Sequence, residues 1–332
     1  MQTRYLISCD WGTSRFRLRV VDSKTLSILA EVKTDNGIQM LSASFEQLRP
    51  HSVSRRQFYL RYLQERIDQL QTTVSFDDQV PVIVSGMASS AIGIEELPYA
   101  TLPCPVSGDN LITQWIQEAA DCCTHPVLLI SGLASDSDVM RGEETQVIGL
   151  HHSKVCDHPE IMYILPGTHS KHVLVKDNRI MNFKTFMTGE LFELLRTHSI
   201  LRSSVSWSGG PVGERENGYF LTGVDQGGKD PFSHSLFAVR TNILLRKYPQ
   251  ELNYFYLSGL LIAEELQALN IGDHSRICLS ADGMLMDLYR KALDRLSYGA
   301  SVTVVPSPVA DTATAIAHSL IFQTRSHGYQ PA

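Results

Sequence analysis

The chain repeats one pattern about half its length apart: an apolar strand, a turn that carries Gly-Thr, and a strand in which apolar and polar residues alternate. Alternation at period two predicts a strand with one buried face. In each copy an aspartate follows the turn glycine by ten residues, Asp22 after Gly12 and Asp177 after Gly167. Each copy then enters a third alternating segment. Two such three-stranded units predict a duplicated core.

The first turn offers groups that suit a phosphate. Asp10 stands at the end of the first strand, and Gly12, Thr13 and Ser14 form the turn that follows. Glycine lets the backbone approach a ligand closely, and the amides and hydroxyls of such a turn can cradle phosphate. Asp10 can hold a metal ion beside it. An ordinary hairpin turn has the same local features, and the second copy is what favours a phosphate site.

The second turn offers equivalent donors at Gly167, Thr168 and His169, with Lys171 on the strand after it. The ammonium group of Lys171 either adds a positive charge for phosphate or is that of a solvated strand lysine. Two hairpins of this kind that face each other could hold a nucleotide between them. The alternative is that the two turns share their spacing by chance.

Composition sets limits on the class of protein. At 332 residues the chain is long enough for two domains, and 43% hydrophobic with 19% charged residues is typical of a globular protein. A net charge of -6 argues against nucleic acid as a partner. No apolar run is long enough for a membrane span or a signal peptide, so we expect no membrane partner and a cytoplasmic location. The six cysteines lack metal-ligand spacing, which favours reduced thiols.

Periodicity predicts several further elements outside the hairpins. Helical spacing of apolar residues predicts helices over 45–71, 111–120 and 311–322, with Asp311 as the cap of the last. The stretch 203–229 is rich in serine and glycine and predicts a mobile loop or lid.

A buried strand at 81–84 leads into a loop of small residues that contains Gly86, Met87 and Ser89. Loops at the carboxyl ends of strands line ligand clefts in α/β sheets. The alternative, which the sequence supports equally, is that this loop only connects two elements and binds no ligand.

Two adjacent glutamates follow a glycine at the start of an expected helix, as Gly142-Glu143-Glu144. Acidic residues in a first helical turn often do no more than complement the helix dipole. The same position also suits a general base, which must lie within hydrogen-bond reach of an attacking hydroxyl.

With the two hairpins and the segments between and after them in this order, the chain resembles the sugar-kinase, actin and heat-shock ATPase superfamily. The Asp10–Ser14 turn is similar to its first phosphate motif, and the segment 166–171 is similar to its second. Ser280–Gly283 resembles its adenosine motif, with Gly283 expected at the nucleotide, although Asp282 stands where a glycine is usual.

The superfamily resemblance implies an α/β fold of two duplicated actin-like (ribonuclease H-like) βββαβα domains that flank a nucleotide cleft. We expect the first domain at 1–122, with the first phosphate turn and the sugar-acid side. The second, at 123–332, would carry the second phosphate turn and the adenosine site, and its last helix could return to the first domain.

The resemblance is closer to the 2-dehydro-3-deoxygalactonokinase family, which is similar in the stretches DWGTS, SGMASS, MRGEETQ, LPGTHSK, FMTGELFELL and LSGLLIAEEL. These stretches cover almost the whole chain in one order. The resemblance implies a kinase that uses ATP and Mg²⁺ to phosphorylate the C6 hydroxyl of 2-dehydro-3-deoxy-D-galactonate in galactonate breakdown. Its partners would be the sugar acid and ATP. The oligomeric state stays open, with a homodimer as one alternative.

The resemblance also implies roles for individual residues. Related sugar kinases place the catalytic base just after a glycine at a helix start, so Glu143 is the predicted base and Glu144 the alternative. Many relatives have aspartate at that place. Asp10 is the predicted Mg²⁺ ligand, through water. The predicted contacts of the sugar acid are Arg17, Gly86, Met87, Ser89, Thr188 and Glu190.

Three alternatives to this function differ in chemistry. A kinase of another sugar acid would use the same residues. A phosphohydrolase on the same fold would activate water in place of a sugar hydroxyl. A nucleotide-bound regulator or chaperone-like ATPase would usually carry a further DNA-binding or peptide-binding segment, and the sequence shows no basic helix-turn-helix pattern.

Overall fold

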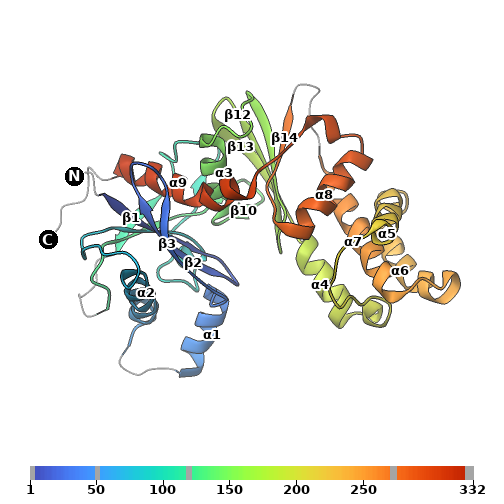
Figure 1. Ribbon diagram of the computed structural model, residues 1–332, viewed down its shortest axis with the longest axis horizontal. Coiled ribbons are helices and arrows are strands. Elements are labelled where there is room, and N and C mark those ends of the chain that lie inside the picture. The colour runs from blue at the N-terminus through green and yellow to red at the C-terminus, as the bar shows by residue number, and fades with distance from the viewer. Residues whose placement is uncertain (1–3, 49–52, 117–121, 270–274, 326–332) are drawn as a thin grey trace. The chain divides into compact units, whose positions relative to one another are not determined.

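The computed structural model describes residues 4–48, 53–116, 122–269 and 275–325 (Figure 1). The chain divides into two compact units. Unit 1 comprises Met1–Asp157, Asn178–Asn182 and Pro308–Ala332, and unit 2 comprises His158–Asp177 and Phe183–Ser307. The first unit therefore extends beyond the predicted boundary at residue 122, and it includes the C-terminal segment.

Unit 1 is built on a six-stranded sheet with the order β3-β2-β1-β4-β8-β7. The first three strands form an antiparallel meander, as predicted, and β4 and β8 continue the sheet in parallel. The bounds are β1 Tyr5–Trp11, β2 Phe16–Asp22, β3 Ile28–Thr34, β4 Val82–Gly86, β7 Thr113–Ile116 and β8 Val127–Ile130.

The predicted helix over 111–120 is wrong where the structure describes it. Thr113–Ile116 is the strand β7, which pairs with β8 in antiparallel register, Trp115 opposite Leu128. The segment contains a β-branched pair and an aromatic residue, which fit an extended strand, and pairing with β8 satisfies its backbone. Residues 117–120 lie outside the described residues.

One face of the meander is apolar and the other is polar. Trp11 and Phe16 pack edge to face with ring centroids 4.8 Å apart, and Trp11 also contacts Tyr59 and Tyr62. This face is covered by α1 (Ile38–Leu48) and α2 (Arg55–Gln71). The predicted single helix over 45–71 is thus two helices, because Ser54 caps the second with its side chain.

The polar face is closed by α9 (Ser307–Arg325), and Figure 1 shows α9 on the opposite side of these strands from α1 and α2. His318 of α9 is completely buried, with Nδ1 2.8 Å from Ser8 Oγ on β1 and Nε2 2.9 Å from Ser85 Oγ on β4. Burial lowers the pKa of His318 to about 3, so the ring is neutral. Asp311 lies inside α9 and is not its cap.

Unit 2 repeats the strand order of unit 1, as β15-β14-β11-β12-β13 against β8-β4-β1-β2-β3. This shared order confirms the predicted duplication. Arg179 and Ile180 at the start of β13 belong to unit 1, where they pair with the short strand β6, Cys104–Pro105. The bounds are β11 Glu160–Leu165, β12 Ser170–Lys176, β13 Arg179–Phe186, β14 Arg276–Leu279 and β15 Val302–Val304.

The predicted lid over 203–229 is wrong, because α5 (Glu214–Gln226) lies within it and crosses the buried helix α7 (Gln250–Leu266). A Cβ added at Gly223 would stand 2.1 Å from the Tyr256 carbonyl oxygen, and one at Gly259 would stand 2.0 Å from the Phe220 carbonyl oxygen. The glycines therefore mark a close helix crossing rather than a flexible loop.

The remaining elements complete the two units. Unit 1 contains a small sheet of β5, β9 and β10, and α3 follows β10 directly. None of the described helices is both long and apolar enough to cross a membrane. The further bounds are β5 Ala100–Thr101, β9 Leu133–Ala134, β10 Val139–Met140, α3 Glu143–His152, α4 Thr188–His198, α6 Phe232–Arg246 and α8 Gly283–Arg295, with short 3-10 helices at Met87–Ser89, Ile200–Ser203 and Gly299–Ser301.

Candidate active site

The first turn is held rigidly by its own backbone. The Gly12 N–H donates to the Arg15 carbonyl at 2.9 Å, so this amide is already used inside the turn. The carbonyls of Gly12 and Thr13 accept from the first amides of α1, at Ile38 and Gln39. Within the part of the chain that the structure describes, the N–H groups of Thr13 and Ser14 have no hydrogen-bond partner, and they are the donors left for a phosphate.

Asp10 lies at the end of β1, opposite Arg17 on β2 and beside Ser85 on β4. Burial raises the pKa of the Asp10 carboxyl, the arginines at 17 and 19 lower it, and the charge of Glu143 raises it. No hydrogen bond reaches the Asp10 carboxylate from any other described residue. Asp10 is half-buried, and a bound cation would stabilise a carboxylate in such a position without a hydrogen-bond donor.

Arg17 and Arg19 anchor the polar face of the meander. Arg19 is almost fully buried, and its Nε donates to Glu31 Oε1 at 2.6 Å while its Nη1 donates to the Asp311 carbonyl. Arg17 is more open, with Nε 3.9 Å from Glu31 and Nη1 3.7 Å from Asp311. Arg17 therefore stands nearer to solvent beside Asp10, whereas the buried Arg19, which the sequence reasoning missed, joins α9 to the sheet.

Three segments of unit 1 converge through two glycines. Gly86, at the end of β4, has φ +88°, and a Cβ there would stand 2.6 Å from the Trp11 carbonyl oxygen. Gly142, at the start of α3, has φ +112°, and its Cβ would stand 3.2 Å from Gly86 Cα. These approaches bring the ends of β1 and β4 against the N-terminus of α3. They place Glu143 near Asp10, consistent with the effect of the Glu143 charge on the Asp10 pKa.

The loop after β4 is fixed by Arg141. The Arg141 guanidinium donates to the Ser89 carbonyl and hydroxyl, the latter at 2.8 Å, and lies 4.1 Å from the centroid of the Tyr99 ring. Ser89 is completely buried and donates to the Ile130 carbonyl at 2.7 Å. The Ser89 hydroxyl thus supports the loop. Met87 is only partly buried, so of these two predicted sugar-acid contacts it is the more accessible.

The two glutamates of α3 stand in different environments. Glu144 is completely buried, and both its oxygens accept from the Gly142 N–H, at 3.0 and 2.8 Å. Burial, with the neighbouring Glu143 charge, raises the pKa of Glu144 to about 7. Glu143 is partly exposed and accepts from the Arg141 N–H at 3.1 Å. Of the two side chains, only that of Glu143 is open to solvent.

In unit 2 the second turn is packed against the start of α4. A Cβ at Gly189 would stand 2.4 Å from the Gly167 carbonyl oxygen, and the Glu190 N–H donates to the Thr168 carbonyl at 3.0 Å. Glu190 Oε2 lies 2.5 Å from His169 Nε2. Open space surrounds the Cβ position of Gly167, so a ligand can approach this backbone closely.

Two further predicted nucleotide contacts lie in unit 2. Lys171 is mostly buried, and its ammonium group donates to the His169 carbonyl at 3.3 Å, so it is not a solvated strand lysine. Gly283 begins α8 after β14 with φ +52°, and its Cβ position is also open. A helix N-terminus with an open backbone suits an anionic or polar ligand.

The profile of the 2-keto-3-deoxy-galactonokinase family matches residues 10–317. The chain belongs to this family. It is 33% identical over 258 residues to the 2-dehydro-3-deoxygalactonokinase of Escherichia coli (strain K12), covering 75% of this chain and 82% of that protein. A relative from Rhizobium meliloti (strain 1021), named a probable 2-dehydro-3-deoxygalactonokinase, is 31% identical over 315 residues. The match covers 92% of this chain and 94% of that protein.

A solved structure supports the same family at the level of the whole fold. A Sinorhizobium meliloti protein assigned as a 2-dehydro-3-deoxygalactonokinase matches with a TM-score of 0.75 at 28% identity, covering 97% of this chain and 99% of that one. The predicted family is therefore confirmed, and with it the predicted enzyme class, a kinase that phosphorylates an alcohol group.

For a member of this kinase family, the donors in the structure fit ATP and a magnesium ion. The free amides of the first turn and the open backbone of Gly167 in the second suit phosphate oxygens. Among the described residues there is no cluster of three metal-ligating side chains. Mg²⁺ usually binds through one or two carboxylates together with water and phosphates, so Asp10 meets this requirement.

One pocket lies apart from all these residues. It has a volume of about 310 Å³ in unit 1, and none of the site residues described above lines it. Its lining residues are Thr101, Leu102, Pro103, Ala134, Ser135, Asp136, Met181 and Asn182.

Proposed function

We propose that the chain transfers the γ-phosphoryl group of ATP to the C6 hydroxyl of 2-dehydro-3-deoxy-D-galactonate. The observation that supports this most is local to unit 1. The half-buried carboxylate of Asp10 lacks a hydrogen-bond donor among the described residues, stands beside a turn with free amides, and is electrostatically coupled to Glu143. Phosphoryl transfer requires this combination of a metal ligand, phosphate donors and a base.

In this proposal Asp10 holds Mg²⁺, which neutralises charge on the phosphates when it is bound. Thr13 and Ser14 of the first turn donate backbone N–H groups to phosphate oxygens. The second turn, where open space surrounds the Gly167 backbone, provides the second cradle. The role of Lys171 is that of a nearby positive charge held by the His169 carbonyl.

Glu143 is the proposed base. It takes the proton of the C6 hydroxyl while that oxygen bonds to the γ-phosphorus and the bond from that phosphorus to the bridging oxygen breaks, which releases ADP. The hydrogen bond from the Arg141 N–H orients the Glu143 carboxylate. Glu144 supports this step from the interior, because it binds the Gly142 amide that starts the helix.

The sugar acid is proposed to contact Arg17, Gly86 and Met87 in unit 1. Two predicted contacts, Ser89 and Thr188, use their hydroxyls for internal hydrogen bonds, so the proposal leaves these two residues out of the sugar-acid contacts. We also infer a reducing, cytoplasmic setting, because all six cysteines are buried thiols.

The direct test is an assay of ADP release over a panel of 2-keto-3-deoxy sugar acids that differ in the configuration of single carbons. The expected result is ADP release that depends on one acid of the panel, with a phosphate monoester as product. ADP release at the same rate without any sugar acid would instead identify a phosphohydrolase. Turnover of a different epimer would retain the kinase and change its substrate.

A further inference from the structure

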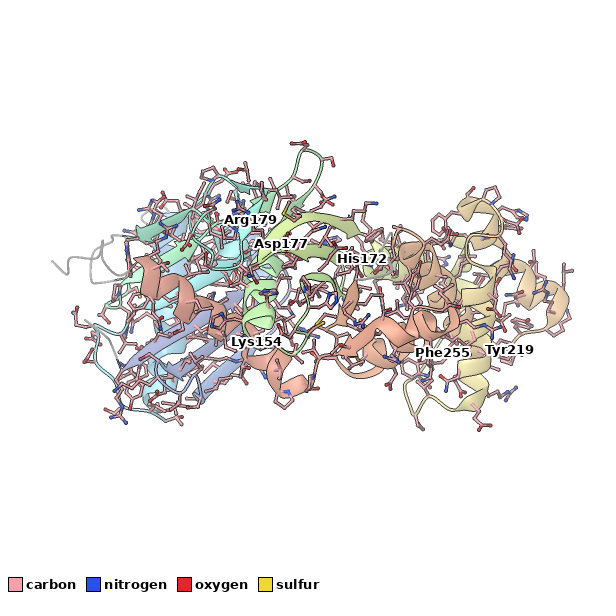
Figure 2. All side chains as sticks on the ribbon, turned by 90° about the horizontal axis from the view of Figure 1, so that it is seen from above. Lys154, His172, Asp177, Arg179, Tyr219 and Phe255 are labelled. Atoms are coloured by element: carbon pink, nitrogen blue, oxygen red, sulfur yellow. The ribbon has the colours of Figure 1, made fainter. Side chains whose placement is uncertain are left out.

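A buried carboxylate joins four elements of unit 2. Glu265 of α7 is only 3% exposed. Its Oε1 lies 2.9 Å from Nε2 of His172 on β12. Its Oε2 accepts from the Tyr289 hydroxyl of α8 at 2.7 Å and from the Thr188 hydroxyl at the start of α4. Figure 2 labels His172 on its strand and Phe255 on α7, the helix that carries Glu265.

This cluster reaches the second phosphate turn by two routes. The Tyr289 hydroxyl lies 3.1 Å from Ser170 Oγ, which accepts from the Gly167 N–H at 3.4 Å. Thr188 precedes Gly189, which packs against the Gly167 carbonyl. Glu265 therefore contacts both the support of the turn and the helix start that lies on it.

A gain in folding stability does not explain why a carboxylate is buried at this position. A buried charge requires good hydrogen bonds, and well-packed apolar residues of similar volume are often as stable. The helix α7 is otherwise apolar along the Leu257–Ala263 stretch, with the exception of Ser258. A glutamate that collects donors from a strand and two other helices fixes their relative positions, which an apolar residue would not do.

We propose that Glu265 is a positioning residue for ATP, which sets the second phosphate turn through Tyr289 and Ser170 and the start of α4 through Thr188. It does not touch the nucleotide itself. This inference rests on the proposed function in that the turn at Gly167 binds phosphate. It adds a residue on α7 whose removal should weaken the binding of ATP rather than that of the sugar acid.

The test measures ATP binding by calorimetry, alongside the KM values for both substrates, in Glu265→Gln and Tyr289→Phe. We expect each variant to raise the Kd and KM for ATP about tenfold, with the sugar-acid KM within twofold of wild type. Both substitutions remove the same hydrogen bond between Tyr289 and Glu265. The double variant should therefore have a Kd for ATP no higher than that of the weaker-binding single variant. Thr188→Ser should bind ATP like wild type, whereas Thr188→Val should not.

Asn253→Ala is the matched control. Asn253 is also buried on α7 and donates to the carbonyls of Ser204 and Val239, at 2.9 and 2.8 Å, away from the second turn. The Asn253→Ala substitution should lower the melting temperature without changing the Kd for ATP. If Tyr289→Phe and Glu265→Gln behave in the same way as this control, the positioning role is overturned.

The two proposals fail in different ways. If wild type binds ATP but phosphorylates no sugar acid, the proposed function fails, and the calorimetric comparison still tests Glu265. If wild type is an active kinase and the ATP affinity of Tyr289→Phe is unchanged, the positioning role fails alone. Should Glu265→Gln not fold, Tyr289→Phe provides the same comparison.

Discussion

Gly142 lies directly against Gly86, so that a methyl group added at Gly142 would stand 3.2 Å from Gly86 Cα. Gly142 also has φ +112°, a conformation that alanine rarely adopts. Gly142→Ala should therefore cost about 1–3 kcal/mol of stability and displace Glu143, lowering kcat more than ATP affinity. Urea unfolding and steady-state kinetics measure both effects. Gly218→Ala, at an open site inside α5, is the control and should be neutral or stabilising.

Asp10→Asn should leave the fold intact and lower kcat by about 10²-fold or more, because the neutral amide no longer attracts the metal that stabilises charge in the transition state. The measurement is turnover across a Mg²⁺ titration. Asp22→Asn is a matched control in the same hairpin, since the Asp22 carboxylate accepts from the Lys24 and Thr25 amides at the far end of β2. Equal turnover of Asp10→Asn and wild type at saturating Mg²⁺ would refute the metal role.

Glu143→Gln should lower kcat by about 10²- to 10⁴-fold with ATP binding retained, because a positioned base contributes that much. Glu144→Gln should keep a large part of kcat, since the Glu144 side chain is completely buried and binds the Gly142 amide. Single-turnover rates with saturating substrates separate the two variants. If Glu144→Gln is inactive and Glu143→Gln is active, the roles are exchanged, and if both are active, the base is another acid, with Asp136 and Asp138 next to be tested.

Glu144 should also shape the dependence of stability on pH. Its pKa is raised to about 7 in the folded state from an ordinary value of 4.5, so between these pH values the folded chain holds a proton that the unfolded chain has lost. The bound proton adds to the free energy of unfolding in full below pH 4.5, and this addition is lost as the pH rises through 7. The full shift in pKa corresponds to roughly 3 kcal/mol. Urea titrations from pH 5 to 7.5 should show a flatter profile for Glu144→Gln than for wild type.

His318 should act in the opposite direction. Its pKa is lowered to about 3 from 6.5, so the unfolded state binds the extra proton between these values and stability falls as pH falls below 6.5. His318→Gln can still bond Ser8 and Ser85, and it should lose less stability than wild type between pH 6.5 and 4. His198→Gln, at an exposed position, provides the control for a histidine without burial. Parallel acid profiles for wild type and His318→Gln would contradict the buried neutral ring.

The strand framework was predictable because period-two alternation and the repeated Gly-Thr turn are local signals. Two of the failures had non-local causes. The strand that contains Trp115 exists because β8 offers a pairing edge, and the helix that contains Gly223 exists because α7 allows a close crossing. Neither partner can be recognised from the segment itself.

The site was predictable as a set of segments but not as a set of atoms. The motifs located the turns, yet only the structure shows that the Gly12 amide, the Ser89 hydroxyl and the Thr188 hydroxyl are already used. The sequence reasoning also passed over Arg141 and Glu265. A glutamate at the end of an apolar helical stretch was the one local signal that could have found Glu265.

The closure of the polar face of unit 1 by α9 has a consequence for the order of synthesis. Ser8 and His318 are 310 positions apart, so the first strand emerges from the ribosome long before its buried partner exists. All of unit 2 is made in between, which means that it can complete its core while unit 1 still exposes the face that carries Ser8, Arg19 and Ser85. The first strand therefore obtains its last packing partner only when α9 has been made. Truncation of α9 should leave this face of unit 1 exposed to chaperones and proteases.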